Sequence, residues 1–115
     1  LYSSSLKLNH VFRRLYHKGN TCANGYLVLY CRKNGQKRNR VGLTVNAKLG
    51  CAVRRNRVRR RLREIYRLHE TQFLPGYDLV VVARGRAMDA PYAELEKAYL
   101  SLAEKLSLLR SEESQ

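Results

Sequence analysis

The most concentrated chemistry in this sequence is a run of arginines between residues 54 and 67. Eight of these fourteen residues are arginine, and Asn56 lies between Arg55 and Arg57. Arginine carries a permanent charge on a planar group of donors, which suits phosphate better than any other side chain. An asparagine amide adds a donor and an acceptor that can read a base edge or a ribose hydroxyl. The run therefore indicates a surface that binds a polyanion.

Apolar residues recur through the same run at helical spacing. They are Val58, Leu62, Ile65, Tyr66 and Phe73, and at about 100° per residue they form one stripe along a helix. We expect a helix that begins after Gly50, reaches about Phe73 and stops at Pro75-Gly76. Because of its stripe, this helix should be docked on a core.

The polar residues of this helix fall on two flanks of the stripe. One flank spans an arc of roughly 100° and holds Asn56, Arg59, Arg60, Arg63 and Arg67. Arg54, Arg57 and Arg61 lie toward the other flank. A solvated charged face is the alternative interpretation, but like charges this dense repel one another on a helix. A partner that neutralises them is the simpler explanation.

Charge is distributed unevenly along the chain. The net charge is +14, and residues 1–63 contain seventeen Lys and Arg with no Asp or Glu. Such a one-sided field favours nucleic acid as the partner, with an anionic membrane surface as the competing polyanion. Without carboxylates in this half, neither a paired-carboxylate site nor a metal-nuclease site can be built there. We expect no catalytic residue in the protein itself.

The remaining pattern predicts an α+β fold in one domain spanning residues 1–115, with residues 1–5 and 111–115 frayed. Helices are expected from Asn9 to Gly19 and from Asp89 onward. The second has an apolar stripe made of Leu95, Tyr99, Leu102, Leu106 and Leu109. Strands are expected at residues 26–33, 40–46 and 77–83, the last apolar on both faces like a central strand. The Asn34-Gly35 turn predicts a hairpin between the first two. The result is a two-layer sandwich of helices on a central mixed sheet of about four strands.

Aromatic residues give a second candidate binding surface. Phe12, Tyr16, Tyr26 and Tyr30 can line a groove where bases stack, or they can belong to the core. The three cysteines lack paired metal-type spacing, which favours reduced thiols in a cytoplasmic protein over a zinc site. We see neither a signal peptide nor a stretch long enough to span a membrane.

Two stretches resemble the bacterial ribonuclease P protein family. They are residues 41–45 (VGLTV) and 48–60 (KLGCAVRRNRVRR), in which Arg55-Asn56-Arg57 meets the Arg-Asn-Arg signature of that family on its basic helix. Residues 75–84 (PGYDLVVVAR) also fit, and the agreement in order and spacing extends over roughly residues 6–109. The chain departs from the family pattern at Cys51, usually Asn, and at Leu8, which is often basic.

The resemblance implies a partner, a reaction and a fold detail. The family's protein is the subunit of an endoribonuclease holoenzyme, in which a large catalytic RNA removes the 5′ leader of precursor tRNA. Mg²⁺ is held mainly by RNA, and the protein assists substrate binding and metal affinity. One protein per RNA subunit is expected, and no membrane. The family also has a left-handed strand–helix–strand crossover around the basic helix, whereas the general default is right-handed.

The family's binding residues carry over by position. The residues that would contact RNA are Lys48, Arg55, Asn56, Arg57, Arg59, Arg60 and Arg63, to which the helical wheel adds Arg67. The residues that would line a cleft for the single-stranded leader are Phe12, Tyr16, Val28 and Tyr30. Two other readings remain. A ribosomal or other structural RNA-binding protein shares the charge without a substrate cleft, and a DNA-binding helix is disfavoured because arginines with a single amide distinguish bases poorly.

Overall fold

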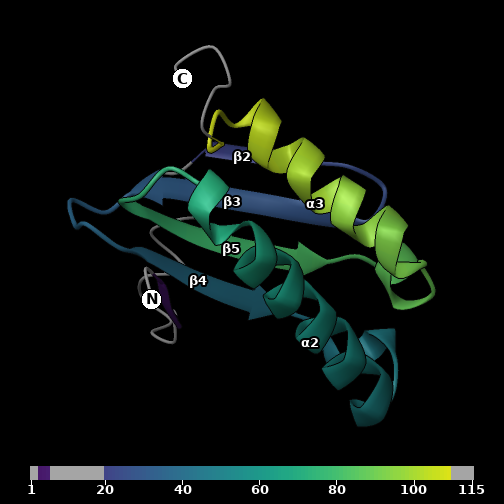
Figure 1. Cartoon of the computed structure of the whole chain (residues 1–115). Helices are drawn as coiled ribbons and strands as arrows, with labels where there is room; N and C mark the ends of the chain where they lie inside the picture. Colours follow the sequence, from purple (N-terminus) through teal and green to yellow (C-terminus); the bar gives the residue numbers. More distant parts are fainter. Residues whose placement is uncertain (1–2, 6–19, 110–115) are drawn as a thin grey trace.

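A mixed β-sheet forms one layer of the structure and two helices form the other (Figure 1). The computed structural model describes residues 3–5 and 20–109. The strands are β1 (Ser3–Ser5), β2 (Asn20–Ala23), β3 (Leu27–Lys33), β4 (Asn39–Thr44) and β5 (Tyr77–Ala83). The helices are α2 (Ala52–His69) and α3 (Tyr92–Lys105), with short 3-10 helices η1 (Ala47–Leu49), η2 (Glu70–Gln72) and η3 (Gly85–Met88). The predicted α+β sandwich with a mixed sheet is confirmed.

Strand β5 lies at the centre of the sheet. The strand order is β1-β4-β5-β3-β2, and β5 pairs in parallel with β4 and antiparallel with β3. Leu79 and Val81 enter the core beneath the helices, while Val80 is fully buried on the opposite face. A strand that is apolar on both faces needs cover on both, so the prediction of a central strand from residues 77–83 is confirmed.

The predicted hairpin between the first two strands is wrong, because β5 lies between β3 and β4. Asn34-Gly35 does begin a turn, but the loop crosses the start of β5 and leads to a strand two places away. The backbone N–H of Asn34 donates to the carbonyl of Gly76 at 2.9 Å. Gly76 has φ +90°, and a Cβ there would lie 2.9 Å from the carbonyl oxygen of Gln36. Glycine is therefore required where loop and strand meet.

The connection from β4 through α2 to β5 is left-handed. In Figure 1 the helices lie in front of the sheet and β4 and β5 point the same way. When the view is turned so that both strands point upward, β5 lies to the left of β4. The handedness implied by the family resemblance therefore holds, against the right-handed default.

Helix α2 is held by the stripe that the sequence predicts. Val58, Leu62, Ile65 and Tyr66 are buried, and each contributes about 1.5–3 kcal/mol on burial. A like-charge pair on a helix surface costs only about 0.2–0.5 kcal/mol, so packing outweighs the repulsion among the arginines. The helix ends at His69 rather than at about Phe73; η2 follows, and Phe73 is buried in extended conformation.

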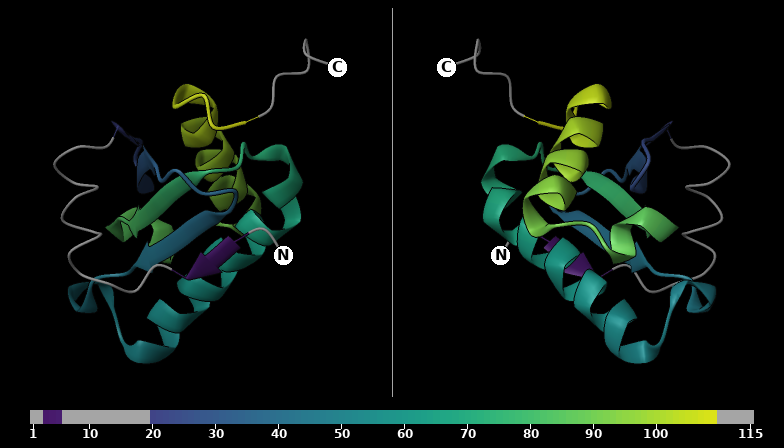
Figure 2. Two further views of the ribbon diagram at one scale, coloured as in Figure 1. Left: turned by 90° about the vertical axis from the view of Figure 1, so that its left-hand side faces the viewer. Right: turned by 90° about the vertical axis from the view of Figure 1, so that its right-hand side faces the viewer.

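Helix α3 lies beside α2 on the same side of the sheet (Figure 2). Leu95, Tyr99 and Leu102 of its predicted stripe are fully buried, and the ring of Tyr99 meets Phe73 edge-on at 6.2 Å. Leu106 and Leu109, which also belong to the predicted stripe, follow the end of the helix at Lys105 and are only partly buried.

The sheet is wider at both edges than the sequence indicated. Residues 3–5, which we expected to fray, form β1 and pair in parallel with β4, and β2 pairs antiparallel with β3. The predicted helix from Asn9 to Gly19 and residues 111–115 lie outside the described residues. In the part of the chain that the structure describes, no helix has the length and apolar character needed to cross a membrane.

Candidate nucleic-acid interface

One flank of α2 carries the row of polar residues that the helical wheel predicts, which is called the arginine stripe from here on. Asn56, Arg60, Arg63 and Arg67 are exposed and Arg59 is half-buried. Arg59 Nη1 donates to Asn56 Oδ1 at 2.9 Å, which fixes the amide and leaves its NH₂ group free to donate outward. Within the described residues, Arg60, Arg63 and Arg67 form no hydrogen bond or ion pair. Three guanidinium groups in a row are thus available to an outside anion.

The start of α2 is fixed by a tight turn that brings Lys48 beside the arginines. The Asn46 side chain accepts from the backbone N–H of Lys48 at 2.8 Å and so caps η1. Arg55 is half-buried, and its Nε donates to the carbonyl of Gly50 at 3.1 Å. Arg55 therefore braces the turn while its terminal nitrogens remain for a ligand, and the exposed Lys48 extends the basic surface beyond the helix.

The other flank of α2 faces the loop that precedes α3. Arg54 forms an ion pair with Asp89, and Arg61 Nη1 donates to the carbonyl of Ala90 at 3.0 Å. Arg57 lies between them along the helix. The two flanks predicted from the helical wheel therefore differ in character, because one is open and the other meets a second element of the fold.

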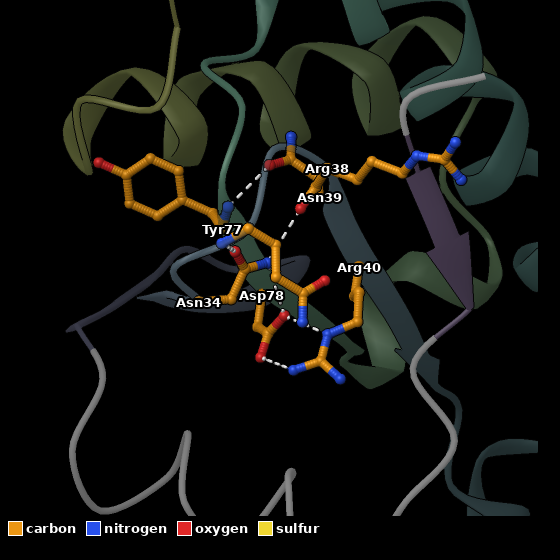
Figure 3. Close-up of polar contacts among 7 residues, drawn as sticks. Asn34, Arg38, Asn39, Arg40, Tyr77 and Asp78 are labelled. Carbon is orange, nitrogen blue, oxygen red and sulfur yellow. Dashed lines mark hydrogen bonds and ion pairs between the residues drawn. The ribbon is translucent and has the colours of Figure 1, made fainter.

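Helix α2 is tied to the sheet by the amide of Asn39. Asn39 is buried on β4, and its Nδ2 donates to the Tyr66 hydroxyl and to the carbonyl of Leu74, each at 3.1 Å. Its Oδ1 accepts from the backbone N–H of Tyr77 at 2.8 Å (Figure 3). Both donors and the acceptor of one side chain are thereby used, which fixes α2, β4 and β5 relative to one another.

The two described residues of the predicted leader cleft lie on the opposite face of the sheet. Leu27, Leu29 and Cys31 of β3 enter the core beneath the helices. Val28 and Tyr30 alternate with them, so both face away from the helices, and both are half-buried. Phe12 and Tyr16 lie outside the described residues. The structure therefore separates the arginine helix from Val28 and Tyr30 by the thickness of the sheet.

Figure 3 shows a charged network around Asp78 that the sequence did not reveal. It lies on the same face of the sheet as Tyr30, because Asp78 pairs with Arg32, two residues beyond Tyr30 on β3. Arg40 binds Asp78 through two parallel hydrogen bonds of 2.7 and 2.6 Å, and Asn34 Nδ2 donates to Asp78 Oδ1 at 3.0 Å. Asp78 is 3% exposed. The hydrogen bond from Arg40 to Asp78 raises the pKa of the Arg40 guanidinium, so Arg40 stays charged.

Arg32 lies across the strand pair from Asp78 on this face and is half-buried. Within the described residues it forms no hydrogen bond or ion pair. The sequence alone did not indicate that Asp78, Arg40 and Arg32 come together. One feature of the sequence could have pointed to this network, because Asp78 is the only acid in the five described strands.

Tyr26 does not share the Tyr30 face, although the strand predicted over residues 26–33 would place these two tyrosines on one side by its two-residue period. The strand begins at Leu27 because the Asn24 side chain accepts from the backbone N–H groups of Tyr26 and Leu27, each at 2.9 Å, and turns the chain there. The Arg86 guanidinium lies 5.0 Å from the centre of the Tyr26 ring. The Tyr26 hydroxyl donates to Glu94 on α3 at 3.4 Å.

Comparison with known proteins identifies the family. The Ribonuclease P family pattern matches residues 2–107. The ribonuclease P protein component of Alkaliphilus oremlandii is 44% identical over 106 residues, which are 92% of this chain and 93% of that protein. That of Clostridioides difficile is 39% identical over 107 residues, 92% and 94% of the two chains. The chain belongs to the ribonuclease P protein family.

Solved structures of this family have the same fold. The RNase P protein of Staphylococcus aureus is similar with a TM-score of 0.86 at 31% identity, covering 96% of this chain and 99% of that one. The Thermotoga maritima protein has a TM-score of 0.78 at 30% identity, with coverage of 85% and 93%. The role of the family is to bind the RNA subunit of an endoribonuclease holoenzyme that processes tRNA, and this chain shares it.

Replacing Arg40 with Met should destabilise the protein by about 1–3 kcal/mol, because Asn34 is then the one side-chain partner left to Asp78 among the described residues. The cost stays below that of a fully buried pair because the Arg40 side chain is 28% exposed. Arg38→Met is the matched control, since Arg38 is exposed on the preceding loop. Urea denaturation measures both, and an equal loss in the two variants would show that the Arg40–Asp78 pair does not support the sheet.

Proposed function

We propose that this chain is the protein subunit of a bacterial ribonuclease P and assists its catalytic RNA in removing the 5′ leader from precursor tRNA. In this proposal α2 binds the RNA subunit and the sheet face with Tyr30 binds the leader. The observation that carries it is the open flank of α2, where Arg60, Arg63 and Arg67 have no partner in the described part of the chain. The same helix holds the Arg-Asn-Arg signature.

The RNA subunit is bound along α2 and the turn before it. The proposed contacts are Lys48, Arg55, Asn56, Arg57, Arg59, Arg60, Arg63 and Arg67. The arginines supply forked donors for phosphate oxygens. Asn56 offers its NH₂ group to a base or ribose acceptor, since its oxygen is occupied by Arg59. Most of the affinity is thus electrostatic and falls with salt.

The leader is bound on the opposite face, where a base can stack on Tyr30 beside Val28. Phe12 and Tyr16 complete this cleft in the proposal. Separation of the two surfaces by the sheet supports simultaneous binding of two RNA segments, one on each side. A structural RNA-binding protein needs only the first surface.

Mg²⁺ in this proposal is held mainly by the RNA partners, and the protein raises its effectiveness by neutralising phosphates near the reaction. One protein binds one RNA subunit, in the cytoplasm. The protein itself contributes positioning and charge, since its first 63 residues hold no carboxylate to act on the scissile bond.

Reconstitution tests the function directly. Adding this protein to a bacterial ribonuclease P RNA at low Mg²⁺ should increase the rate of precursor-tRNA cleavage. The holoenzyme should also bind precursor tRNA more tightly than mature tRNA, because only the precursor carries the leader. If the protein binds RNA but neither increases cleavage nor distinguishes the two substrates, it is a structural RNA-binding protein instead.

Replacing Arg63 with Ala should weaken binding to the RNA subunit and reduce its salt dependence by about one phosphate contact. The measurement is the slope of log affinity against log salt concentration. Lys105→Ala removes the same charge from the end of α3, where Lys105 is exposed, and should leave the slope unchanged. An unchanged slope for Arg63→Ala would argue against a phosphate contact.

Replacing Tyr30 with Ala should weaken binding of leader-bearing substrate by about 1–3 kcal/mol, the value of one stacked base. Tyr30→Phe keeps the ring and should retain most of the affinity. Binding of mature tRNA by the holoenzyme provides the reference. Equal losses for precursor and mature tRNA would show that Tyr30 supports the fold rather than the leader.

A further inference from the structure

A cavity of about 280 Å³ lies between the first half of α2 and the loop before α3. Its lining residues are Arg54, Arg57, Arg61, Met88, Asp89, Ala90 and Pro91. Small-molecule sites usually measure about 300–1,000 Å³, so this space suits one nucleotide rather than a larger ligand. Three arginines on one wall offer cations to a phosphate, and Met88 and Pro91 on the other wall, beside Asp89, offer a small apolar contact to its base.

The three arginines of the cavity differ in what they bind. Arg61 donates to the carbonyl of Ala90 and so joins the two walls. Arg57 has no hydrogen bond or ion pair among the residues that the structure describes. Arg54 is paired with Asp89. Arg57 is therefore free to bind a ligand among the described residues, whereas Arg54 is occupied by Asp89.

The pair between Arg54 and Asp89 is one that an outside anion can displace. The Arg54 side chain is 50% exposed and that of Asp89 is 82% exposed, and exposed ion pairs contribute little to stability. Helix α2 has no acid in its first turn, where a negative charge is favourable. Asp89 supplies that charge from another element. The backbone N–H of Arg54 also lowers the pKa of the Cys51 thiol, so a negative group is favoured at this end of the helix.

We propose that this cavity is a nucleotide-binding pocket, in which a phosphate of the RNA subunit replaces Asp89 on Arg54 and also contacts Arg57. The base lies against Met88 and Pro91. This inference rests on the proposed function, and it extends the RNA surface to Arg54 and Arg61. The RNA subunit is favoured over the leader because the pocket adjoins the arginine stripe of α2, on the side of the sheet opposite Tyr30. Asp89 acts as an internal competitor that sets the affinity.

Removing the charge of Asp89, which competes with the phosphate for Arg54, tests the proposed pocket. Asp89→Asn should tighten binding of the full-length protein to a bacterial ribonuclease P RNA by about two- to fivefold at low salt, and make the salt dependence steeper. Glu104→Gln adds the same charge near the far end of α3, about 18 Å along the helix from its start. That distance exceeds the screening length of about 10 Å at 0.1 M salt, so this control should change little.

A double-variant cycle shows whether the gain acts through Arg54. Arg54→Gln should weaken binding roughly tenfold, the value of one hydrogen bond to a charged group. In that background Asp89→Asn should give no further gain. If Asp89→Asn increases the affinity for the RNA equally with and without Arg54, or if it weakens binding by itself, the proposed pocket is wrong. Thermal unfolding of each variant confirms that the fold is retained.

Two further outcomes separate this inference from the proposed function. If the gain appears only with precursor tRNA and not with the RNA subunit alone, the pocket does not bind the RNA subunit and the inference fails, while the function stands. If the wild-type protein binds a ribonuclease P RNA no better than an unrelated RNA of equal length, the proposed function fails and the inference fails with it.

Discussion

The docking of the apolar stripe of α2 on the sheet is the interaction on which the rest of this structure depends. Eight arginines on one helix repel each other, and an isolated helix of this composition would not be stable. Four buried side chains, with Leu62 and Ile65 completely inaccessible to solvent, hold it in place. The protein can therefore carry a high density of positive charge in a fixed geometry before any partner arrives.

That fixed geometry separates the protein into surfaces with different tasks. The amide of Asn39 locks α2 to β4 and β5, and the sheet places the arginine stripe and Tyr30 on opposite sides. A partner bound on one surface need not compete with a partner on the other. On the Tyr30 face the charge of Arg40 is neutralised by Asp78, so within the described strands the positive charge open to a partner on that face comes from Arg32.

The periodic features of this fold could be predicted from the sequence, whereas contacts between distant segments could not. The stripe of α2 follows from the 3.6-residue period and the centrality of β5 from its apolar residues on both faces. The Asn34-Gly35 turn does not specify which strand pairs with which, so the order of the sheet was missed. Its left-handed crossover was expected from family resemblance alone, since the general rule predicts the reverse.

The same limit applies to the candidate site. The residues of the arginine stripe could be predicted, because the rotation of about 100° per residue along one helix determines which side chains share a flank. The pairing of Arg40 with Asp78 depends on the register of two strands 38 residues apart, and the contact of Arg61 with Ala90 spans 29 residues. Tyr26 was misplaced because Asn24 turns the chain one residue later than the alternation indicated.

The central position of β5 also has a consequence for how the chain is made. Strands β3 and β4 are complete by residue 44, but the strand that joins them does not begin until residue 77. During synthesis the intervening helix leaves the ribosome before its docking surface exists. Residues 20–69 hold fourteen Lys and Arg and a single acid, so the nascent segment is a polycation surrounded by RNA. When β5 pairs between β3 and β4, the sheet is complete and α2 can dock on it. The arginines then have a fixed arrangement in place of an unspecific attraction to RNA.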